Sequence, residues 1–384
     1  MRRLNNLVTL FTAIVAFFFG SFITRILTIV DKCPAQRSGV AKLEPHPDLF
    51  LAILVFSAPG NAEQREGMRE TWLRLGQPLK QPYYPEEYIY LPSYSTAGGH
   101  LQMETVASQA QRLHHYINWQ KQLPQLEQPR VHRNIKLKHL FAIGTQQMGA
   151  TLRAELEHEQ SQHHDLLLLP RLHDDYMNLT EKLMQSLDAL TRHYEFSYLL
   201  KVDDDTYVKL DNLLNELVSY DRKLLRNRAN YEHEPLPELY WGYFNGRSTI
   251  KTKGHWRESN YYISKNYINY ALGGGYVLSR KLCENVVNNS HLLSSYVSED
   301  ASLGTWLAPL RHVYRWHDAR FDTAYTPSKC RSYHLVLHKR NQRQMHDIYA
   351  GSLCTHENPG QRVFVSYYYD WTKPADKCCD SIVV

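Results

Sequence analysis

Three carboxylates directly follow an apolar run in the segment Tyr198-Leu199-Leu200-Lys201-Val202-Asp203-Asp204-Asp205. Such a run predicts a buried strand, and ligands bind at the carboxyl ends of strands in open α/β sheets. Asp203 and Asp205 lie two apart in an extended chain, so their side chains point to the same side. Oxygen ligands with this spacing suit Mn²⁺ or Mg²⁺, which shares its coordination with substrate phosphates. An isolated aspartate triplet is more often a solvated turn, but the strand before it favours a metal site.

Strand and helix patterns alternate on the amino-terminal side of this segment. The continuous apolar run Leu49–Phe56 predicts a strand that is buried on both faces, and a helix carrying Arg65, Arg69 and Trp72 follows it. Further strands are expected at residues 139–143, 165–169 and 198–202, and further helices at residues 150–160 and 180–194. This order predicts an α/β fold with a mainly parallel central sheet covered by helices.

Other segments of the chain have a less regular pattern. Residues 76–130 are rich in Gln, Pro and Tyr and lack a sustained period, so we expect a long loop or insertion there. Asn178 and Glu181 have the spacing of a capping pair for the helix that follows. The elements after residue 210 are more mixed than those before it.

The amino-terminal residues predict a membrane anchor. Residues 4–24 contain no charged side chain, and about 20 such residues in a helix span a bilayer. Arg2 and Arg3 precede the run, so the positive-inside bias puts a tail of residues 1–6 in the cytoplasm. We therefore expect a signal-anchor transmembrane helix at residues 7–30 and a stem at residues 31–48. A cleaved signal peptide is the alternative, but no Ala-x-Ala-like cleavage site follows the run.

Two further features agree with a location in the secretory lumen. The tripeptides that begin at Asn178 and Asn288 are N-glycosylation acceptors. Four of the six cysteines lie near the carboxyl end, at positions 330, 354, 378 and 379. In an oxidising compartment they can form up to two bridges in three possible connectivities.

The net charge of +5 suits anionic partners such as a nucleotide diphosphate, and the sequence lacks the patterns of nucleic-acid-binding proteins.

Five sequence blocks, taken in order, resemble the β-1,3-galactosyltransferase family over residues 49–345. The blocks are Arg65-x-x-x-Arg69-x-Thr71-Trp72, Asp174-Asp175-Tyr176-x-Asn178-Leu179-Thr180-x-Lys182, Lys201-Val202-Asp203-Asp204-Asp205, Gly274-Gly275-Tyr276-Val277-Leu278-Ser279 and Glu299-Asp300. The resemblance implies a GT-A-like nucleotide-sugar transferase fold, a divalent metal, inversion at the anomeric carbon and a single-pass type II protein of the Golgi membrane. Residues 49–345 would be the lumenal catalytic domain, and residues 346–384 a cysteine-containing tail.

The resemblance also implies roles for particular residues. Asp205 would be the direct metal ligand, Asp203 and Asp204 would hold the metal shell and the ribose, and His338 would complete the metal site. His317, close to two aspartates, is the competing histidine. Asp300 would be the base that accepts the acceptor's proton, with Glu299 beside it in the catalytic pair. The alternative for both acids is an ordinary helix start after Ser298.

Further candidates carry an explicit alternative. The family blocks place Arg65, Arg69, Asp175 and Lys182 at the nucleotide, and a solvated helix face is the alternative for the two arginines. Substrate-binding candidates are Trp241, Gly274, Gly275 and Tyr276. Glycines would let a sugar approach the backbone closely, or would form a flexible turn. Trp241, like Tyr243 and Trp256, would stack on a sugar or fill the core.

Three further blocks and the Cys378-Cys379 pair resemble the family members of the glycosaminoglycan linkage region. The blocks are residues 240–247, 298–309 and 317–323. They imply transfer of galactose from UDP-galactose to the 3-hydroxyl of Gal-β-1,4-Xyl on a proteoglycan core protein. Implied partners are the Golgi membrane and a second copy of the chain or another linkage-region transferase. Ala301, where the family commonly has Val, and the long 76–130 segment depart from the pattern, and the segment leaves the fit of the acceptor open.

Three alternative functions compete with galactosyl transfer. N-acetylglucosaminyl transfer would use the same scaffold. A transferase-like lumenal chaperone would have lost the acidic triplet or the base, and this chain keeps both. A metal-dependent hydrolase would need a further His/Asp cluster for a second metal.

Overall fold

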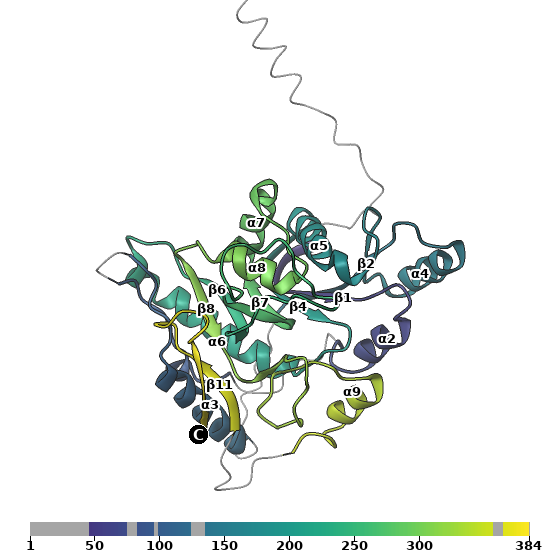
Figure 1. The fold of residues 1–384 in the computed structure, drawn as a ribbon. Helices are drawn as coiled ribbons and strands as arrows, with labels where there is room; N and C mark the ends of the chain where they lie inside the picture. The colour runs from purple at the N-terminus through teal and green to yellow at the C-terminus, as the bar shows by residue number, and fades with distance from the viewer. Residues whose placement is uncertain (1–45, 75–82, 96–98, 124–134, 356–363, 384) are drawn as a thin grey trace, which may run out of the picture. The chain divides into compact units, whose positions relative to one another are not determined.

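A seven-stranded sheet forms the centre of the computed structural model, which describes residues 46–74, 83–95, 99–123, 135–355 and 364–383 (Figure 1). The strand order is β3-β2-β1-β4-β7-β6-β8. The strands are β1 (His46–Phe56), β2 (Leu137–Gly144), β3 (Leu166–Leu169), β4 (Tyr194–Asp203), β6 (Glu238–Asn245), β7 (Tyr270–Ser279) and β8 (Val313–His317). Of these seven, β7 alone runs against the others, because it pairs antiparallel with both β4 and β6. The predicted α/β class and mainly parallel sheet are therefore confirmed.

Strand β1 is apolar from Leu49 to Phe56 because both faces of this part are covered. Leu51, Ile53 and Val55 belong to a core cluster that includes side chains of α3 (Val106–Gln122) and α6 (Leu210–Arg226). Ala52 and Leu54 are also fully or almost fully buried, and alternate side chains of a strand point to opposite faces. Helices α5 (Leu179–His193), α7 (Arg280–Asn288) and α8 (Glu299–Leu307) pack together over the other face (Figure 1).

The elements predicted on the amino-terminal side of the acidic triplet are present. Helix α2 (Ala62–Glu70) follows β1, and α4 (Ala150–His163) follows β2. The register pairs Ile53 with His139 of β2 and with Leu200 of β4, so β1 lies between these two parallel strands. This arrangement brings the carboxyl ends of β1 and β4 side by side, at Phe56 and Asp203.

Two expectations about local structure are wrong. Residues 106–122, inside the segment expected to be a long loop, form helix α3, and the side chain of Thr105 accepts a hydrogen bond from Ser108 N at its start. Asn178 does precede α5, but its side chain makes no capping bond and donates instead to His173 O at 3.0 Å. Glu181 accepts from Gln185 Nε2 and does not complete a capping box.

Smaller elements complete the described part of the fold. A three-stranded sheet has the order β5-β10-β9, and a hairpin pairs β11 with β12. Their bounds, with those of the remaining helices, are β5 (Tyr207–Val208), β9 (Phe321–Asp322), β10 (Val336–Leu337), β11 (Phe364–Tyr369), β12 (Cys379–Val383), α9 (Gln342–Tyr349), η1 (Glu86–Tyr88), η3 (Tyr176–Asn178), η4 (Arg228–Tyr231) and η5 (Ser290–Leu292).

Two disulfides select one of the three open connectivities. Cys330 bonds to Cys354, and Cys378 bonds to its neighbour Cys379. The second bridge packs against Gly246, where a Cβ atom would lie 1.9 Å from Cys378 Sγ. Helices long and apolar enough to cross a bilayer do not occur within the described ranges, and the anchor predicted at residues 7–30 lies outside them.

Candidate active site

The acidic triplet lies where β4 ends, and a histidine from another part of the chain joins it. Asp203, Asp205 and His338 each offer one ligand atom, and these atoms lie within 4.8 Å of one another. His338 follows β10, and its backbone N–H donates to Asp322 O of β9 at 2.9 Å. The sequence therefore named the three residues that the fold brings together.

The hydrogen bonds of His338 present its Nε2 atom as an acceptor. Thr206 Oγ1 donates its single proton to Gly274 O at 2.8 Å and lies 3.0 Å from His338 Nδ1. Nδ1 must therefore carry the proton of that second contact, and Asp205 Oδ1 lies 3.1 Å from the same nitrogen without accepting a hydrogen bond from it. A neutral imidazole protonated at Nδ1 has its lone pair on Nε2, the arrangement typical of a metal-binding histidine.

The surroundings of Asp205 fit a divalent cation. Its Oδ1 atom is buried and accepts no hydrogen bond within the described part of the chain. Burial alone would raise the pKa of Asp205, but the contacts with His338 and Lys339 lower it to about 2, so the carboxylate stays charged. Two carboxylates and one imidazole form a donor set that suits Mn²⁺.

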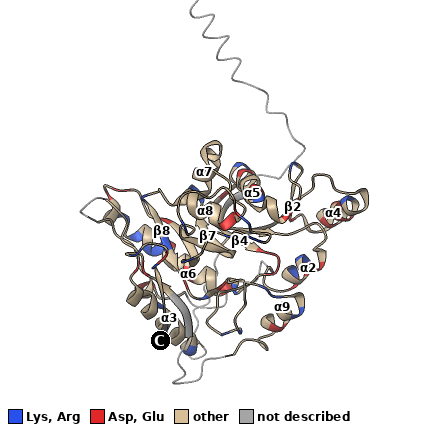
Figure 2. Ribbon diagram, in the orientation of Figure 1, with Lys and Arg blue, Asp and Glu red and all other residues tan. Residues whose placement is uncertain are grey.

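Lys201 connects the metal-site carboxylates to a second acidic pair. The Nζ atom of Lys201 lies 2.9 Å from Asp203 Oδ1, donates to Gly273 O at 2.7 Å, and lies 3.3 Å from Glu299 Oε2. Figure 2 shows acidic residues where β4 ends and where α8 begins. Because one buried ammonium touches both groups, the two acidic pairs belong to the same site.

Glu299 and Asp300 have different surroundings although they are neighbours. Glu299 is buried, accepts a hydrogen bond from the Tyr276 hydroxyl, and has its pKa raised by burial to about 7. Asp300 is partly exposed and accepts backbone N–H bonds from Gly273 at 2.9 Å and Ala301 at 2.8 Å. Burial also raises the pKa of Asp300, which increases its affinity for a proton. Of the two acids, Asp300 is the one that faces the site.

The glycines of β7 make room for the protein's own side chains. A Cβ at Gly274 would lie 2.6 Å from Cγ of His338, and one at Gly273 would lie 3.3 Å from Oδ2 of Asp300. Gly275 faces Val336 in the same way. The alternative of a flexible turn is wrong, because residues 273–275 continue strand β7. Their close approach is to His338 and Asp300, on opposite faces of β7.

The residues expected at the nucleotide mostly hold the loop after β1. Lys182 Nζ donates to Ser57 O and to both oxygens of Asp174, each at 2.8 Å. Asp204 accepts from Asn61 Nδ2 at 2.9 Å, and burial raises its pKa. Asp175 accepts from Met177 N and is otherwise exposed. This loop forms a wall of the site beside the triplet.

Arg65 and Arg69 face α4 and do not form a solvated helix face. Both guanidinium groups pair with Glu159 at 2.6 Å, and Arg69 also pairs with Asp165. Arg65 also donates to Ala58 O at 2.7 Å. Through these contacts both arginines stabilise the β1–α2 loop. Their guanidinium donors are engaged within the protein, so neither arginine offers one to a nucleotide in this conformation.

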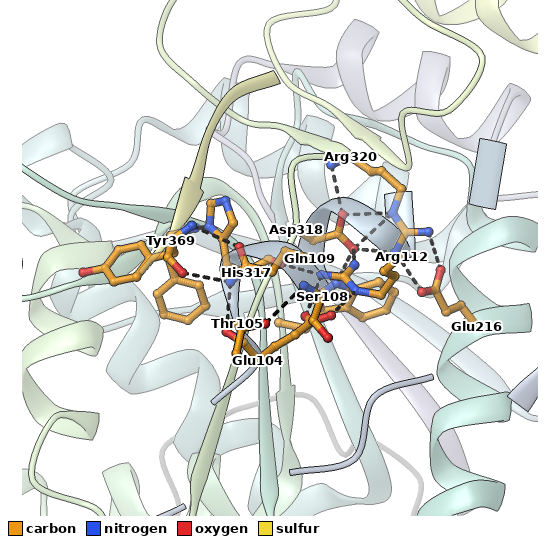
Figure 3. Close-up of polar contacts among 12 residues, drawn as sticks. Glu104, Thr105, Ser108, Gln109, Arg112, Glu216, His317, Asp318, Arg320 and Tyr369 are labelled. Atoms are coloured by element: carbon orange, nitrogen blue, oxygen red, sulfur yellow. Dashed lines mark hydrogen bonds and ion pairs between the residues drawn. The ribbon is translucent and has the colours of Figure 1, made fainter. Parts of the chain in front are cut away.

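The remaining candidates lie in the core. Trp241 is fully buried, stacks on Trp316 with ring centroids 4.6 Å apart, and donates to Asp318, so its alternative role of filling the core holds. Tyr276 is also fully buried. His317 accepts from Phe244 N through Nδ1 and lies apart from the triplet's cluster. Its neighbour Asp318 belongs to a buried ion-pair network that the sequence did not predict (Figure 3).

A family model and a relative that matches almost the whole chain indicate the same family. Residues 119–315 match the family model described as Galactosyltransferase. The chain is 37% identical to mouse beta-1,3-galactosyltransferase 6 over 94% of this chain and 92% of that protein. It is 32% identical to zebrafish UDP-GalNAc:beta-1,3-N-acetylgalactosaminyltransferase 2, over 40% of this chain and 28% of that protein. A mannosyltransferase from Pyrobaculum calidifontis, solved with GDP-Man and Mn²⁺, aligns with a TM-score of 0.29 and 11% identity over 73% of this chain and 58% of that one.

Proposed function

Because the chain belongs to the galactosyltransferase family, we propose that it transfers galactose from UDP-galactose to the 3-hydroxyl of a β-galactoside. One observation carries the proposal: a cation-binding cluster of Asp203, Asp205 and His338 and the carboxylate of Asp300 lie on two sides of one short segment of β7. This arrangement supports a diphosphate site at the cluster, beside an acid that can accept a proton. A GT-A-like arrangement of nucleotide and metal is part of the proposal.

Asp203, Asp205 and His338 would hold Mn²⁺ or Mg²⁺. A divalent cation in this position supplies positive charge that neutralises the diphosphate as UDP leaves. Lys201 keeps Asp203 in place, and Lys339 does the same for Asp205 at 3.0 Å. Asp204, between the two ligands, is held by Asn61 and is proposed to hold the ribose.

Asp300 would accept the proton of the attacking hydroxyl. The acceptor oxygen forms a bond to the anomeric carbon while the bond from that carbon to the UDP oxygen breaks, so the configuration inverts. The proton passes to Asp300, whose raised pKa suits a base that must compete for it. Glu299 stays in contact with Lys201 and Tyr276, and we assign it the positioning of Lys201.

The acceptor and the cellular setting are also proposals. The name of the mouse relative supports a β-1,3 linkage and a galactose donor. The blocks shared with linkage-region enzymes support galactosyl transfer to Gal-β-1,4-Xyl on proteoglycan core proteins. The segment 7–30, which is mainly apolar and has Arg25 as its one charged side chain, supports a single-pass type II anchor in the Golgi membrane. Glycosylation is proposed at Asn288, which is exposed at the end of α7, and at Asn178.

The experiment uses the full-length protein with UDP-galactose, Mn²⁺ and a galactosyl-xyloside, followed by linkage analysis of the product. The expected product carries a new β-1,3-linked galactose, and chelation of the metal should prevent its formation. UDP-GalNAc is the matched donor control, because the zebrafish relative bears that donor in its name. Transfer from UDP-GalNAc alone would reject the donor assignment, and release of free galactose without disaccharide would reject the transfer reaction.

A further inference from the structure

Two aromatic side chains meet at the surface and have no part in the reaction described above. Tyr176 of η3 is 63% exposed and lies in the Asp-Asp-Tyr block. The ring of Trp256 meets it edge to face, with centroids 5.8 Å apart and an angle of 87°. The ring of His255 is also close to Tyr176, at 6.4 Å. Met177, beside Tyr176, is 55% exposed. Exposed apolar groups that gather in this way mark binding surfaces.

Tyr176 lies in a segment that hydrogen bonds connect to the β1–α2 loop, which lies beside the acidic triplet. Two residues before it, Asp174 accepts from Gly144 N at 2.7 Å and pairs with Lys182, which holds the β1–α2 loop. Asn61 of the same loop donates to Asp204 of the acidic triplet at 2.9 Å. Hydrogen bonds therefore connect the segment before Tyr176 to the loop that contacts the triplet.

Trp256 belongs to the opposite wall, which carries the base. It lies in the connection between β6 and β7, residues 246–269. Two residues further on, Glu258 accepts from Val297 N at 2.8 Å, and Val297 leads directly into α8 with Asp300. A buried cluster of Tyr261, Tyr267, Tyr270, Tyr296 and Ala301 joins the same connection to α8. The position of Trp256 is thus tied to the position of Asp300.

We propose that Tyr176 and Trp256 together form the stacking subsite for the acceptor sugar. The proposal rests on the proposed function, since the acceptor hydroxyl must lie at Asp300 while the donor lies at the metal ligands. A sugar in that position extends between the two walls that the aromatic pair joins. A β-galactoside presents a face of C–H groups at C3, C4 and C5, which matches an aromatic ring, while its hydroxyls remain for polar contacts.

Steady-state kinetics of the full-length protein test the subsite. With saturating UDP-galactose and Mn²⁺, Trp256→Ala should raise KM for the galactosyl-xyloside about three- to tenfold, the size of an aromatic contact. The KM for UDP-galactose should not change, and Trp256→Phe should restore most of the acceptor affinity. Tyr176→Ala should act in the same direction. Tyr262→Ala is the matched control, because Tyr262 lies in the same connection and is 85% exposed.

The results of these measurements decide whether Tyr176 and Trp256 form the acceptor subsite. An unchanged acceptor KM in Trp256→Ala, or an equal rise in Tyr262→Ala, would overturn the subsite. Saturation-transfer NMR with methyl β-galactoside, UDP and Mn²⁺ adds a readout that needs no turnover. If the wild type transfers no galactose, the proposed function fails and the NMR signal decides the subsite alone. A signal lost in Trp256→Ala supports it, and an absent or unchanged signal rejects it.

Discussion

The molecule contains two clusters of charged side chains that are built on opposite principles. The closed cluster consists of Glu104, Arg112, Glu216, Asp318 and Arg320 (Figure 3). The open cluster consists of Lys201, Asp203, Asp204, Asp205, Glu299, Asp300 and Lys339. Both lie beside the central sheet, and both combine acids and bases from distant parts of the chain. Their difference is in how completely the protein satisfies its own charges.

In the closed cluster, every carboxylate forms an ion pair with the guanidinium group of an arginine. Arg320 binds both oxygens of Glu216, at 2.6 and 2.8 Å, and also pairs with Asp318. Arg112 holds Glu104 and Asp318 and donates to His317 O. These five side chains are at most 4% exposed. Bidentate pairs of this kind are strong and geometrically specific, so the cluster fixes α3 and α6 against the end of β8 and needs no ligand.

In the open cluster, the acids outnumber the bases, five carboxylates against two lysines. Asp205 retains a buried oxygen that accepts no hydrogen bond among the described residues. Burial raises the pKa of Asp204, Asp300 and Glu299, so the fold holds negative charge there at a cost in stability. The contrast between unmatched charge in the open cluster and fully matched charge in the closed cluster supports the proposal that the open cluster binds a cation and a substrate.

The largest effect should follow from breaking the open cluster at Asp205. Asp205→Asn removes a charged ligand, and the loss of several kcal/mol of electrostatic stabilisation predicts a fall in kcat/KM of roughly a thousandfold or more. Unfolding should occur at a lower temperature, because His338 and Lys339 lower the pKa of Asp205 and the folded protein therefore favours the charged carboxylate. Calorimetric titration with Mn²⁺ and UDP checks the cause. Near-normal transfer with normal Mn²⁺ binding would contradict the metal assignment.

The closed cluster should respond in stability and not in chemistry. Arg320→Met leaves Glu216 and Asp318 buried without their partner, which should lower the free energy of unfolding by about 3–5 kcal/mol. Urea denaturation measures this change. The double variant Arg320→Met with Glu216→Leu should recover part of the loss, because it removes one of the uncompensated charges. If the folded Arg320→Met protein lost its affinity for Mn²⁺, the separation of the two clusters would be wrong.

A change at the base should be smaller than at the metal ligand. Asp300→Asn keeps the shape and one acceptor oxygen but cannot take the proton, so kcat should fall about a hundredfold. Affinity for UDP and Mn²⁺ should be unchanged, which isothermal titration can show. Glu299→Gln is the matched control. If Glu299→Gln abolished turnover and Asp300→Asn did not, the two roles would have to be exchanged.

The sequence predicted the open cluster better than the closed one, for a physical reason. The triplet can be recognised from the local sequence, because an apolar strand ends directly in three acids. His338 was found through the resemblance alone, since nothing in its spacing connects it to Asp205. The glycines of β7 were identified as candidates. Their contacts with His338 and Asp300 were not predicted, because these two residues come from distant segments of the chain.

Helix α3 shows why the closed cluster was missed. Its buried residues at positions 109, 112, 113, 116 and 117 have helical spacing, yet two of them are Gln109 and Arg112. A hydrophobic period is broken when polar side chains occupy core positions. Gln109 bonds to Tyr369 in the carboxyl-terminal hairpin, and Arg112 bonds to Asp318. These partners are distant in the sequence and meet only in the folded chain. The local sequence shows the polar residues without their partners, so the segment was predicted to be a loop.

The smallest predicted effect concerns the start of that helix, next to the closed cluster. Thr105 Oγ1 accepts from Ser108 N at 3.2 Å, and Thr105→Ala should lower the free energy of unfolding by about 1 kcal/mol. Thr105→Ser, which keeps the hydroxyl, should cost much less. Because Glu104 holds Arg112 beside this cap, Thr105→Ala combined with Arg320→Met tests whether cap and cluster act together. A loss larger than the sum of the two single losses would show that α3 is held as one cooperative unit with the ion pairs, while unchanged kcat in each folded variant would keep this unit separate from the chemistry at Asp205.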